Sequence, residues 1–238
     1  MQNTSATWKQ LQAGEHRAES KVLIDGVEYP IVVLDSSDPT PVRLCRLTRQ
    51  LFTASDPIGN AISATLEIIY TPASAPSRRA EVRPYRRLVG EDGTKSEWLP
   101  DGVFWIGERK QREYGQLRLI CYDALRKSEQ PYMDEVDTGN WPRQADVVVR
   151  ECAAKIGVEL DSRTAINSAY MVEYPNDFDR VTVRQMLCEI AAAHAGNWTM
   201  TPEGRLRLVG LADVPEEENL LVTEDGDAIS LGGVCIIV

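Results

Sequence analysis

Two stretches of the chain place hydrophobic residues at the spacing of an amphipathic helix. In residues 183–194 the apolar side chains recur at intervals of three and four, which aligns them along one face of a helix with 3.6 residues per turn. Thr182 is a candidate N-cap and Gly196 a candidate C′ residue for this helix. Residues 145–156 repeat the pattern and are followed by Gly157. We therefore predict two successive units in which a helix is followed by a glycine and a strand.

Each predicted helix leads into a short strand. Residues 158–160 resume as a strand after the first helix, and residues 197–200 do so after the second. The segment 201–204, Thr-Pro-Glu-Gly, is typical of a turn, because proline fixes φ and glycine accepts a positive φ. Residues 205–209 alternate polar and apolar side chains, as a half-buried return strand does. The second unit is thus predicted to end in a two-stranded hairpin.

The first half of the chain has the shorter periodicity of β-strands. Asp25-Gly26 separates two apolar runs in KVLIDGVEYPIVV, which is a strong hairpin signal. Many short strands separated by turns are typical of an antiparallel sandwich or barrel. The fold class is therefore predicted to be α+β, with an antiparallel β-barrel or sandwich domain and a small α/β domain. Further strands are expected at residues 42–47, 62–70, 81–89, 102–109 and 116–122.

These changes of pattern divide the chain into four segments. Residues 1–20 are a polar N-terminal arm, residues 21–129 the β-domain and residues 130–212 the small α/β domain. An acidic run at 216–218 marks the next boundary, and residues 213–238 form a C-terminal segment that ends in the apolar run GGVCIIV. An exposed apolar edge strand favours aggregation. We therefore expect the C-terminal segment to return to the β-domain or to pair with a neighbour.

Composition and charge narrow the classes of partner. With 43% hydrophobic residues the chain can build a sizeable core, and its formal net charge of −10 argues against nucleic-acid binding, which depends on lysine and arginine. No apolar run is long enough to cross a membrane as a helix. The five cysteines form no CxxC motif, and the N-terminal residues lack the apolar region of a secretion signal. This usage indicates free, buried thiols in a reducing compartment.

Residue types suited to catalysis occur but do not form a recognisable set. Cys188 and His194 are six residues apart, a spacing that does not bring them face to face on a helix, and Glu189 is expected to point to solvent. Asp177 and Asp179 have the chemistry of an acid/base pair or a calcium site, but the favoured interpretation is turn and cap residues. Zinc, phosphate-loop and nucleophile-elbow motifs are absent. We therefore predict no enzymatic activity and no catalytic, metal-binding or cofactor-binding residues.

Five hydrophobic residues are candidates for a protein interface. Trp98 and Trp105 flank a Pro-Asp-Gly turn, and Trp141 is the aromatic anchor of a predicted loop. Ile236 and Val238 lie in the strand-like C-terminal run. Large aromatic side chains pack cores or interfaces, and they can also line a ligand groove.

The order of several segments resembles a known family. These segments are FTASDPIGNAISATLEIIY, SEWLPDGVFWIGE, LRLICYDALRKSEQ, IGVELD and VTVRQMLCEIAAAHAGNWTMTPEGRLRLV. Together they are similar to the baseplate hub, or tail-associated, proteins of tailed bacteriophages and prophages. The resemblance covers roughly residues 21–238.

The resemblance implies a tube-like β-barrel that is interrupted by the α/β domain as an insertion. It also implies a homotrimeric ring that closes the end of the tail tube, contacts tube, distal-tail and tip or fibre proteins, and reaches the virion tail tip after assembly in the host cytoplasm. The chain stops near the point where the second half of the barrel should begin. We therefore expect it not to complete a ring alone and to carry no enzymatic domain of the family.

Two other functions remain open at the level of sequence. One is an N-terminal fragment of a tail-associated cell-wall hydrolase. The other is a β-rich carbohydrate- or receptor-binding module that uses Trp98, Trp105 or Trp198 as stacking platforms.

Overall fold

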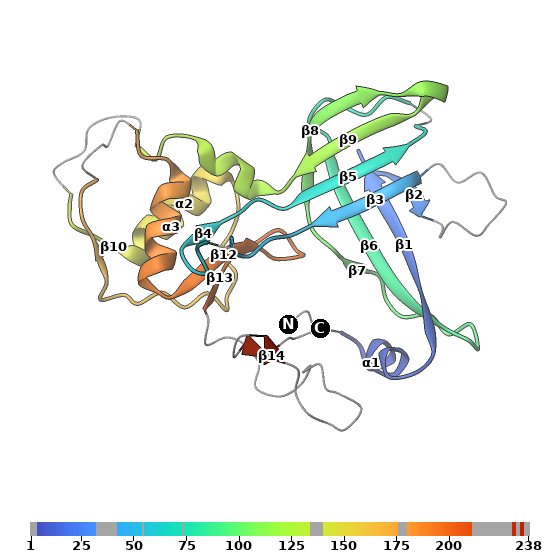
Figure 1. Ribbon diagram of the computed structural model, residues 1–238, viewed down its shortest axis with the longest axis horizontal. Helices are drawn as coiled ribbons and strands as arrows, with labels where there is room; N and C mark the ends of the chain where they lie inside the picture. The colour runs from blue at the N-terminus through green and yellow to red at the C-terminus, as the bar shows by residue number, and fades with distance from the viewer. Residues whose placement is uncertain are drawn as a thin grey trace.

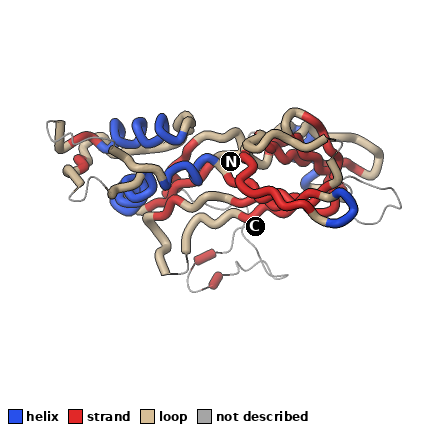
Figure 2. The backbone as a smooth tube through the Cα atoms, turned by 90° about the horizontal axis from the view of Figure 1, so that it is seen from above, coloured by secondary structure: helices blue, strands red, loops and turns tan. Residues whose placement is uncertain are grey.

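The chain forms two lobes, one built mainly from a large sheet and one from two helices and a small sheet (Figure 1). Seen from above, the molecule is elongated, with the two longest helices at one end and most strands at the other (Figure 2). The fold class is thus α+β, as predicted. The computed structural model describes residues 4–31, 42–53, 55–72, 74–133, 140–175 and 180–210, and the backbone of residues 230–231 and 234–235.

The large sheet has eight antiparallel strands within the described residues, in the order β2-β1-β6-β8-β9-β5-β3, with β7 pairing to β6. Side chains alternate between a buried and a more exposed face, as the period of a half-buried strand requires. Its strands are β1 (His16–Ile24), β2 (Val27–Ile31), β3 (Val42–Thr48), β5 (Thr65–Tyr70), β6 (Glu81–Gly90), β7 (Leu99–Pro100), β8 (Phe104–Gln111) and β9 (Leu117–Tyr122).

The sheet is curled but not closed, which corrects the prediction of a barrel. The end strands β2 and β3 approach one another, yet no hydrogen-bonded ladder joins them in the described part of the chain. Pro30 in β2 has no N–H to donate, and β3 contains an irregularity between Val42 and Leu44. Both features disfavour a regular ladder at this edge.

The first hairpin forms as predicted. Asp25 and Gly26 both have positive φ, at 54° and 78°, which is the backbone of a type I′ turn between β1 and β2. The predicted N-terminal arm contains a short helix, α1 (Ala6–Gln12), which Ser5 caps. Trp8 of this helix packs on Leu88 and Leu99 of the sheet lobe.

The helical lobe is built around α2 (Ala145–Ile156) and α3 (Val183–Ala193), whose apolar faces are fully buried. Thr182 caps α3 in a capping box with Gln185, which confirms the predicted start of this helix. The core of this lobe also contains Trp198. Its other elements are η2 (Ala124–Glu129), β4 (Asn60–Ala61), β10 (Arg143–Gln144), β11 (Met171–Val172), β12 (Gly196–Met200) and β13 (Leu206–Gly210).

Two local predictions in this lobe need correction. The left-handed residue after α3 is Ala195, with φ 47°, and Gly196 is already the first residue of β12. Glycine is needed at 196 because a Cβ there would lie 2.8 Å from the carbonyl oxygen of Val209 on the neighbouring strand. The predicted strand at 158–160 is reduced to a single bridge between Leu160 and Leu206. The β12–β13 hairpin itself is confirmed.

The C-terminal segment is described only in part. Two short strands, β14 (Ser230–Leu231) and β15 (Val234–Cys235), pair with one another. The remaining residues of 211–238, which include Ile236 and Val238, lie outside the described residues.

The buried face of α3 should carry much of the stability of the helical lobe. Leu187 and Ile190 are fully buried, so replacing either with alanine leaves a cavity, and we expect a loss of about 2–5 kcal/mol in the free energy of unfolding. Chemical denaturation measures this loss. The exposed Glu189 on the same helix provides the control, because Glu189→Ala should change stability by less than about 0.5 kcal/mol. Equal losses for all three variants would contradict this packing.

Candidate functional site

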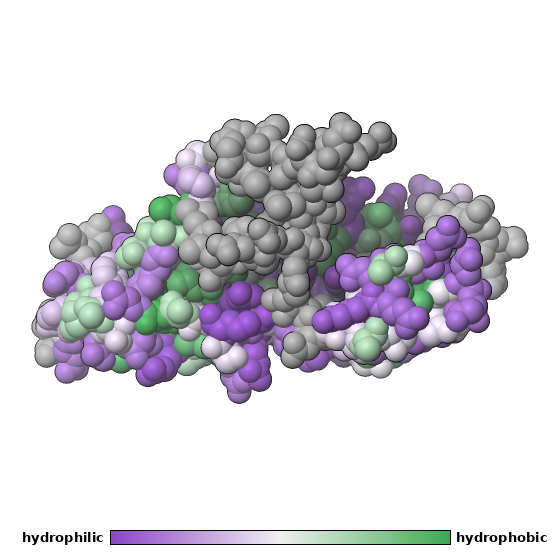
Figure 3. Space-filling view, turned by 90° about the horizontal axis from the view of Figure 1, so that it is seen from below, coloured by the Kyte–Doolittle hydropathy of each residue, from purple (hydrophilic) through white to green (hydrophobic). Residues whose placement is uncertain are grey.

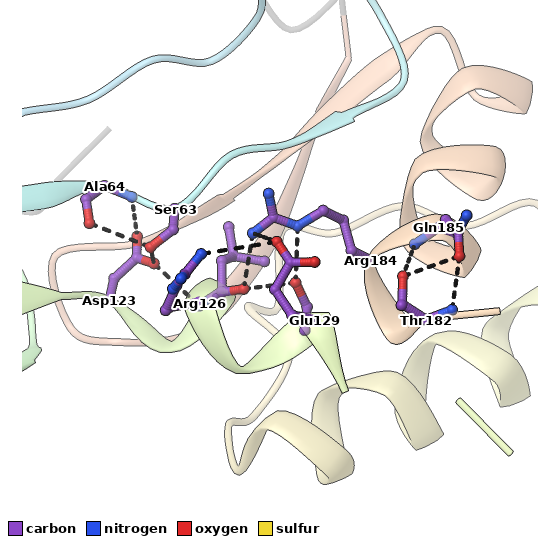
Figure 4. Close-up of polar contacts among 10 residues, drawn as sticks. Ser63, Ala64, Asp123, Arg126, Glu129, Thr182, Arg184 and Gln185 are labelled. Carbon is purple, nitrogen blue, oxygen red and sulfur yellow. Dashed lines mark hydrogen bonds and ion pairs between the residues drawn. The ribbon is translucent and has the colours of Figure 1, made fainter. Parts of the chain in front are cut away.

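The junction between the lobes is held by one buried carboxylate. Two connections run side by side across it, from β4 into β5 and from β9 into η2 (Figure 1). Asp123 lies on the second connection and is only 4% exposed. It accepts hydrogen bonds from Ser63 Oγ at 2.8 Å and from the backbone N–H of Ala64 at 2.9 Å, both on the first connection (Figure 4). One side chain therefore fastens the two crossings together.

Asp123 also starts the short helix that follows it. Its Oδ1 accepts the N–H of Leu125 at 3.0 Å, so it is the N-cap of η2. Burial raises the pKa of the Asp123 carboxyl, and the hydrogen bonds from Ala64, Ser63 and Leu125 oppose that shift only in part.

The helix that Asp123 caps is in turn fixed to α3. Arg184 of α3 forms an ion pair with Glu129 at 3.2 Å (Figure 4). The same guanidinium donates to Ser128 Oγ at 3.3 Å and to the carbonyl oxygen of Leu125 at 3.4 Å. The contacts therefore run from the sheet, through Asp123 and η2, to the main helix of the other lobe.

The segment that enters β4 fixes the junction from the other side. The buried Asn197 Oδ1 of β12 accepts the backbone N–H and the side-chain amide of Asn60, each at 2.9 Å. Asn197 Nδ2 donates to the carbonyl oxygen of Pro57 at 2.8 Å. Gly59 has φ 79°, and a Cβ there would meet the Cβ of Ala192 at 3.1 Å. The short strands β4 and β12 thus pair in parallel, through Asn60 with Asn197 and Ala61 with Trp198. This pairing secures the connection from the sheet lobe to the helical lobe.

The three predicted interface tryptophans are all half-buried, and each makes its own internal contacts. Trp98 lies against the cations of Lys21 and Arg87, 4.6 and 4.3 Å from its ring centre. Trp105 packs on the core of the helical lobe, with Lys127 Nζ 4.6 Å from its ring centre. Trp141 makes edge contacts with Tyr132 and Tyr174. The three do not form one cluster.

His194 has a structural role at the end of α3. Its Nδ1 lies 2.8 Å from the carbonyl oxygen of Ile190, and its Nε2 accepts the backbone N–H of Asn167 at 2.9 Å. The ring also meets Tyr170 edge to face. Both ring nitrogens are therefore used in fixing the end of α3.

Four of the five cysteines lie among the residues whose side chains the structure describes. Cys45, Cys121, Cys152 and Cys188 are free, and burial raises the pKa of each thiol, to about 12 for Cys121 and Cys152. No group of three or more histidine, cysteine or acidic side chains there is placed to hold a metal ion. Residues 177 and 179 lie outside the described residues. Among the helices that are described, none has the length and apolarity to span a membrane.

One exposed residue was missed by the sequence reasoning. Tyr114, at the tip of the β8–β9 hairpin, is 91% exposed and has φ 57°, in the short turn η1 (Glu113–Gly115). A non-glycine residue in this left-handed region loses about 1–2 kcal/mol to steric contacts. On the face shown in Figure 3 the sheet lobe, at the right, is mostly hydrophilic with a few scattered hydrophobic residues. The signal in the sequence was the dipeptide Tyr114-Gly115 between two strands, where Asn-Gly or Gly-Gly is usual in a turn.

The comparisons with known proteins give a match of fold only. The structure is similar to the tail protein from Neisseria meningitidis MC58, with a TM-score of 0.50 and 12% identity over 86% of this chain and 54% of that protein. The 43 kDa tail protein of prophage MuSo2 from Shewanella oneidensis gives a TM-score of 0.49 and 11% identity over 82% of this chain and 56% of that protein. The chain thus spans about half the length of each. No family model and no curated protein matches its sequence.

Removing the Asp123 carboxylate should loosen the junction. Asp123→Ala leaves the N–H groups of Ala64 and Leu125 without their acceptor in buried surroundings, and we expect the free energy of unfolding to fall by about 2–5 kcal/mol. Asp92 is a matched control, since it accepts similar local bonds from Thr94 on the exposed surface. Asp92→Ala should have a much smaller effect in the same denaturant titration. Similar losses in the two variants would remove the special role of Asp123.

The raised pKa of Asp123 predicts a pH dependence with a definite sign. Between the ordinary aspartate pKa and the raised folded value, the folded protein binds the proton more tightly than the unfolded chain. The contribution of this group is therefore fully present below about pH 4 and is lost as the pH rises through the folded pKa. We expect the wild type to lose stability relative to Asp123→Asn as the pH is raised from about 4 to about 7. If the wild type keeps or gains stability relative to Asp123→Asn over this pH range, the raised pKa of Asp123 is contradicted.

Proposed function

We propose that this chain is a structural component of a bacteriophage or prophage tail. In the finer form of the proposal it is a hub subunit that closes the end of the tail tube and connects the tube to tip proteins. Its work is binding and not catalysis, and it needs no cofactor. It acts at the tail tip of the virion after assembly in the host cytoplasm.

The observation that carries the proposal is the fold. The structure is matched over 86% of the chain, with a TM-score of 0.50, by a protein that is described as a tail protein. The order of the sequence segments points to the same class. Because the identity is 12%, the fold and not the sequence supports this step.

The contacts between the lobes suit a subunit that must hold its neighbours in fixed relative positions. Asp123, the ion pair of Arg184 with Glu129 and the paired Asn60 and Asn197 join the lobes by contacts that are mostly buried or half-buried. Buried polar networks that are fully satisfied fix one arrangement of the elements they join. A subunit that holds a tube end to tip proteins requires such a fixed arrangement.

The proposal includes a homotrimer in which the helical lobe is an insertion in a tube-like barrel. The curled sheet, whose end strands approach without pairing, is compatible with a barrel that neighbouring subunits or further chain complete. For the carbohydrate-binding alternative, stacking on Trp98 would have to displace Lys21 and Arg87 from its ring. No contact in the described residues favours that alternative or the hydrolase fragment.

The proposal is tested by binding to tail tubes. Purified gold-labelled chain is mixed with tubes assembled from the tube protein of the same phage or prophage and viewed by electron microscopy. We expect label at one end of each tube. Asp123→Ala should reduce end labelling, because it loosens the two lobes, whereas Asp92→Ala should label as the wild type does. Label that is absent, or spread along the sides of the tubes, would contradict a tube-end subunit.

A further inference from the structure

The β8–β9 hairpin presents a tyrosine that its own fold does not use. Tyr114 is 91% exposed, and it and Gly115 have φ of 57° and 72° at the two central positions of the turn. These positions favour asparagine and glycine, since a larger side chain is strained there. The side chain therefore gains no burial within the chain to offset its unfavourable backbone. Tyrosine and arginine are the residue types most enriched at the centres of protein interfaces.

The hairpin tip is basic although the chain is acidic. Residues 109–118, RKQREYGQLR, contain four basic residues and one acidic residue, whereas the chain has a formal net charge of −10. Arg118 pairs with Glu67, and Arg109 donates to the carbonyl oxygen of Pro76. Two further cations, Lys110 and Arg112, are exposed and form no ion pair with any described residue.

A recess whose lining carries two glutamates and one arginine lies at the other end of the sheet lobe, where β1 begins and β6 ends. It has a volume of about 830 Å³ and is lined by residues 14–17, 89–91 and 93. The space beside Gly93 is open and that beside Gly14 nearly so, whereas Leu11 and Asp92 fill the space beside Gly90. Arg17 of this rim is already paired with Glu19 at 3.2 Å.

Two acidic residues on the rim remain available. Glu15 and Glu91 are exposed and form no ion pair within the described part of the chain. A basic tip with a protruding ring and an acidic recess are therefore present on one chain. The two lie at opposite ends of the sheet lobe, so they cannot meet within one copy (Figure 1).

We propose that Tyr114 of one copy inserts into this recess of a second copy, with Lys110 and Arg112 placed beside Glu15 and Glu91. The contact is head to tail, and a head-to-tail contact generates a ring when its rotation closes. It supplies one specific contact for the assembly role proposed above and rests on that role. The partner is a second copy because the same chain carries the basic tip at one end of its sheet lobe and the two free glutamates at the other.

Sedimentation velocity of the purified chain tests this contact over a range of concentrations at low salt. The wild type should self-associate, and association should weaken as salt is added, because the contact joins exposed charges. Tyr114→Ala should raise the dissociation constant by about tenfold or more, as expected for the loss of a central aromatic residue. Phe52→Ala is the matched control, since Phe52 is also a large exposed side chain, at 55%, and lies outside the contact.

Charge-reversal variants distinguish this contact from nonspecific association. Arg112→Glu and Glu91→Arg should each prevent association alone, because each brings like charges together at the contact. An equal mixture of the two variants should form heterodimers, because the acidic tip of one matches the basic recess of the other. Arg46→Glu, an exposed reversal on β3, should associate as the wild type does.

A wild type that stays monomeric at every concentration, or variants that associate as well as the wild type, would overturn the proposal. If Arg112→Glu and Glu91→Arg fail to form heterodimers when mixed, the proposal is overturned as well. Failure here is separable from failure of the tail role, because tube-end labelling is scored with the wild-type chain and does not depend on self-association in solution. Circular dichroism of each variant establishes that loss of association is not loss of folding.

Discussion

The arrangement of the molecule depends on a buried carboxylate, Asp123, that satisfies donors from two separate connections between the lobes. Each lobe has a hydrophobic core of its own, and such cores fix the interior of a lobe without fixing its orientation to another. Asp123 joins the crossings, and η2, which it caps, continues the contact to Arg184 of α3. Hydrophobic packing builds the lobes, and directional polar contacts, together with Trp105 of β8 packed on the core of the helical lobe, set their relation.

The sequence was sufficient for features that depend on near neighbours. The apolar pattern in residues 183–194 predicted the helix and its buried face, and Thr182 marked where that helix begins. Asp25-Gly26 predicted the first hairpin. The cap that Asp123 forms on η2 is a contact of the same local kind, with Leu125 two residues away. Its contacts with Ser63 and Ala64 could not be predicted, because these residues lie 60 and 59 residues away along the chain.

The incorrect predictions concern contacts between residues that are distant along the chain. Gly196 was interpreted as a helix stop, but its reason is the backbone of Val209 across the hairpin. Closure of the barrel was inferred from the number of strands, whereas Pro30 in β2 and the irregular register of β3 act at one edge. The candidate interface of three tryptophans, Ile236 and Val238 is a separate matter, because no contact tests it. Trp98 and Trp105 also make contacts with Arg87 and Lys127 within the chain, which only the folded structure reveals. Their role in an interface stays a prediction.

The central claim is that the two lobes act as one fixed unit at the end of a phage tail. Cryo-electron microscopy of purified tails from the phage or prophage that encodes this chain tests it most directly. The account predicts density at the end of the tube into which both lobes fit together, with the connections at Asp123 in the orientation described here. Tails that lack this chain, or density in which the lobes must be placed in a different relation, would contradict it.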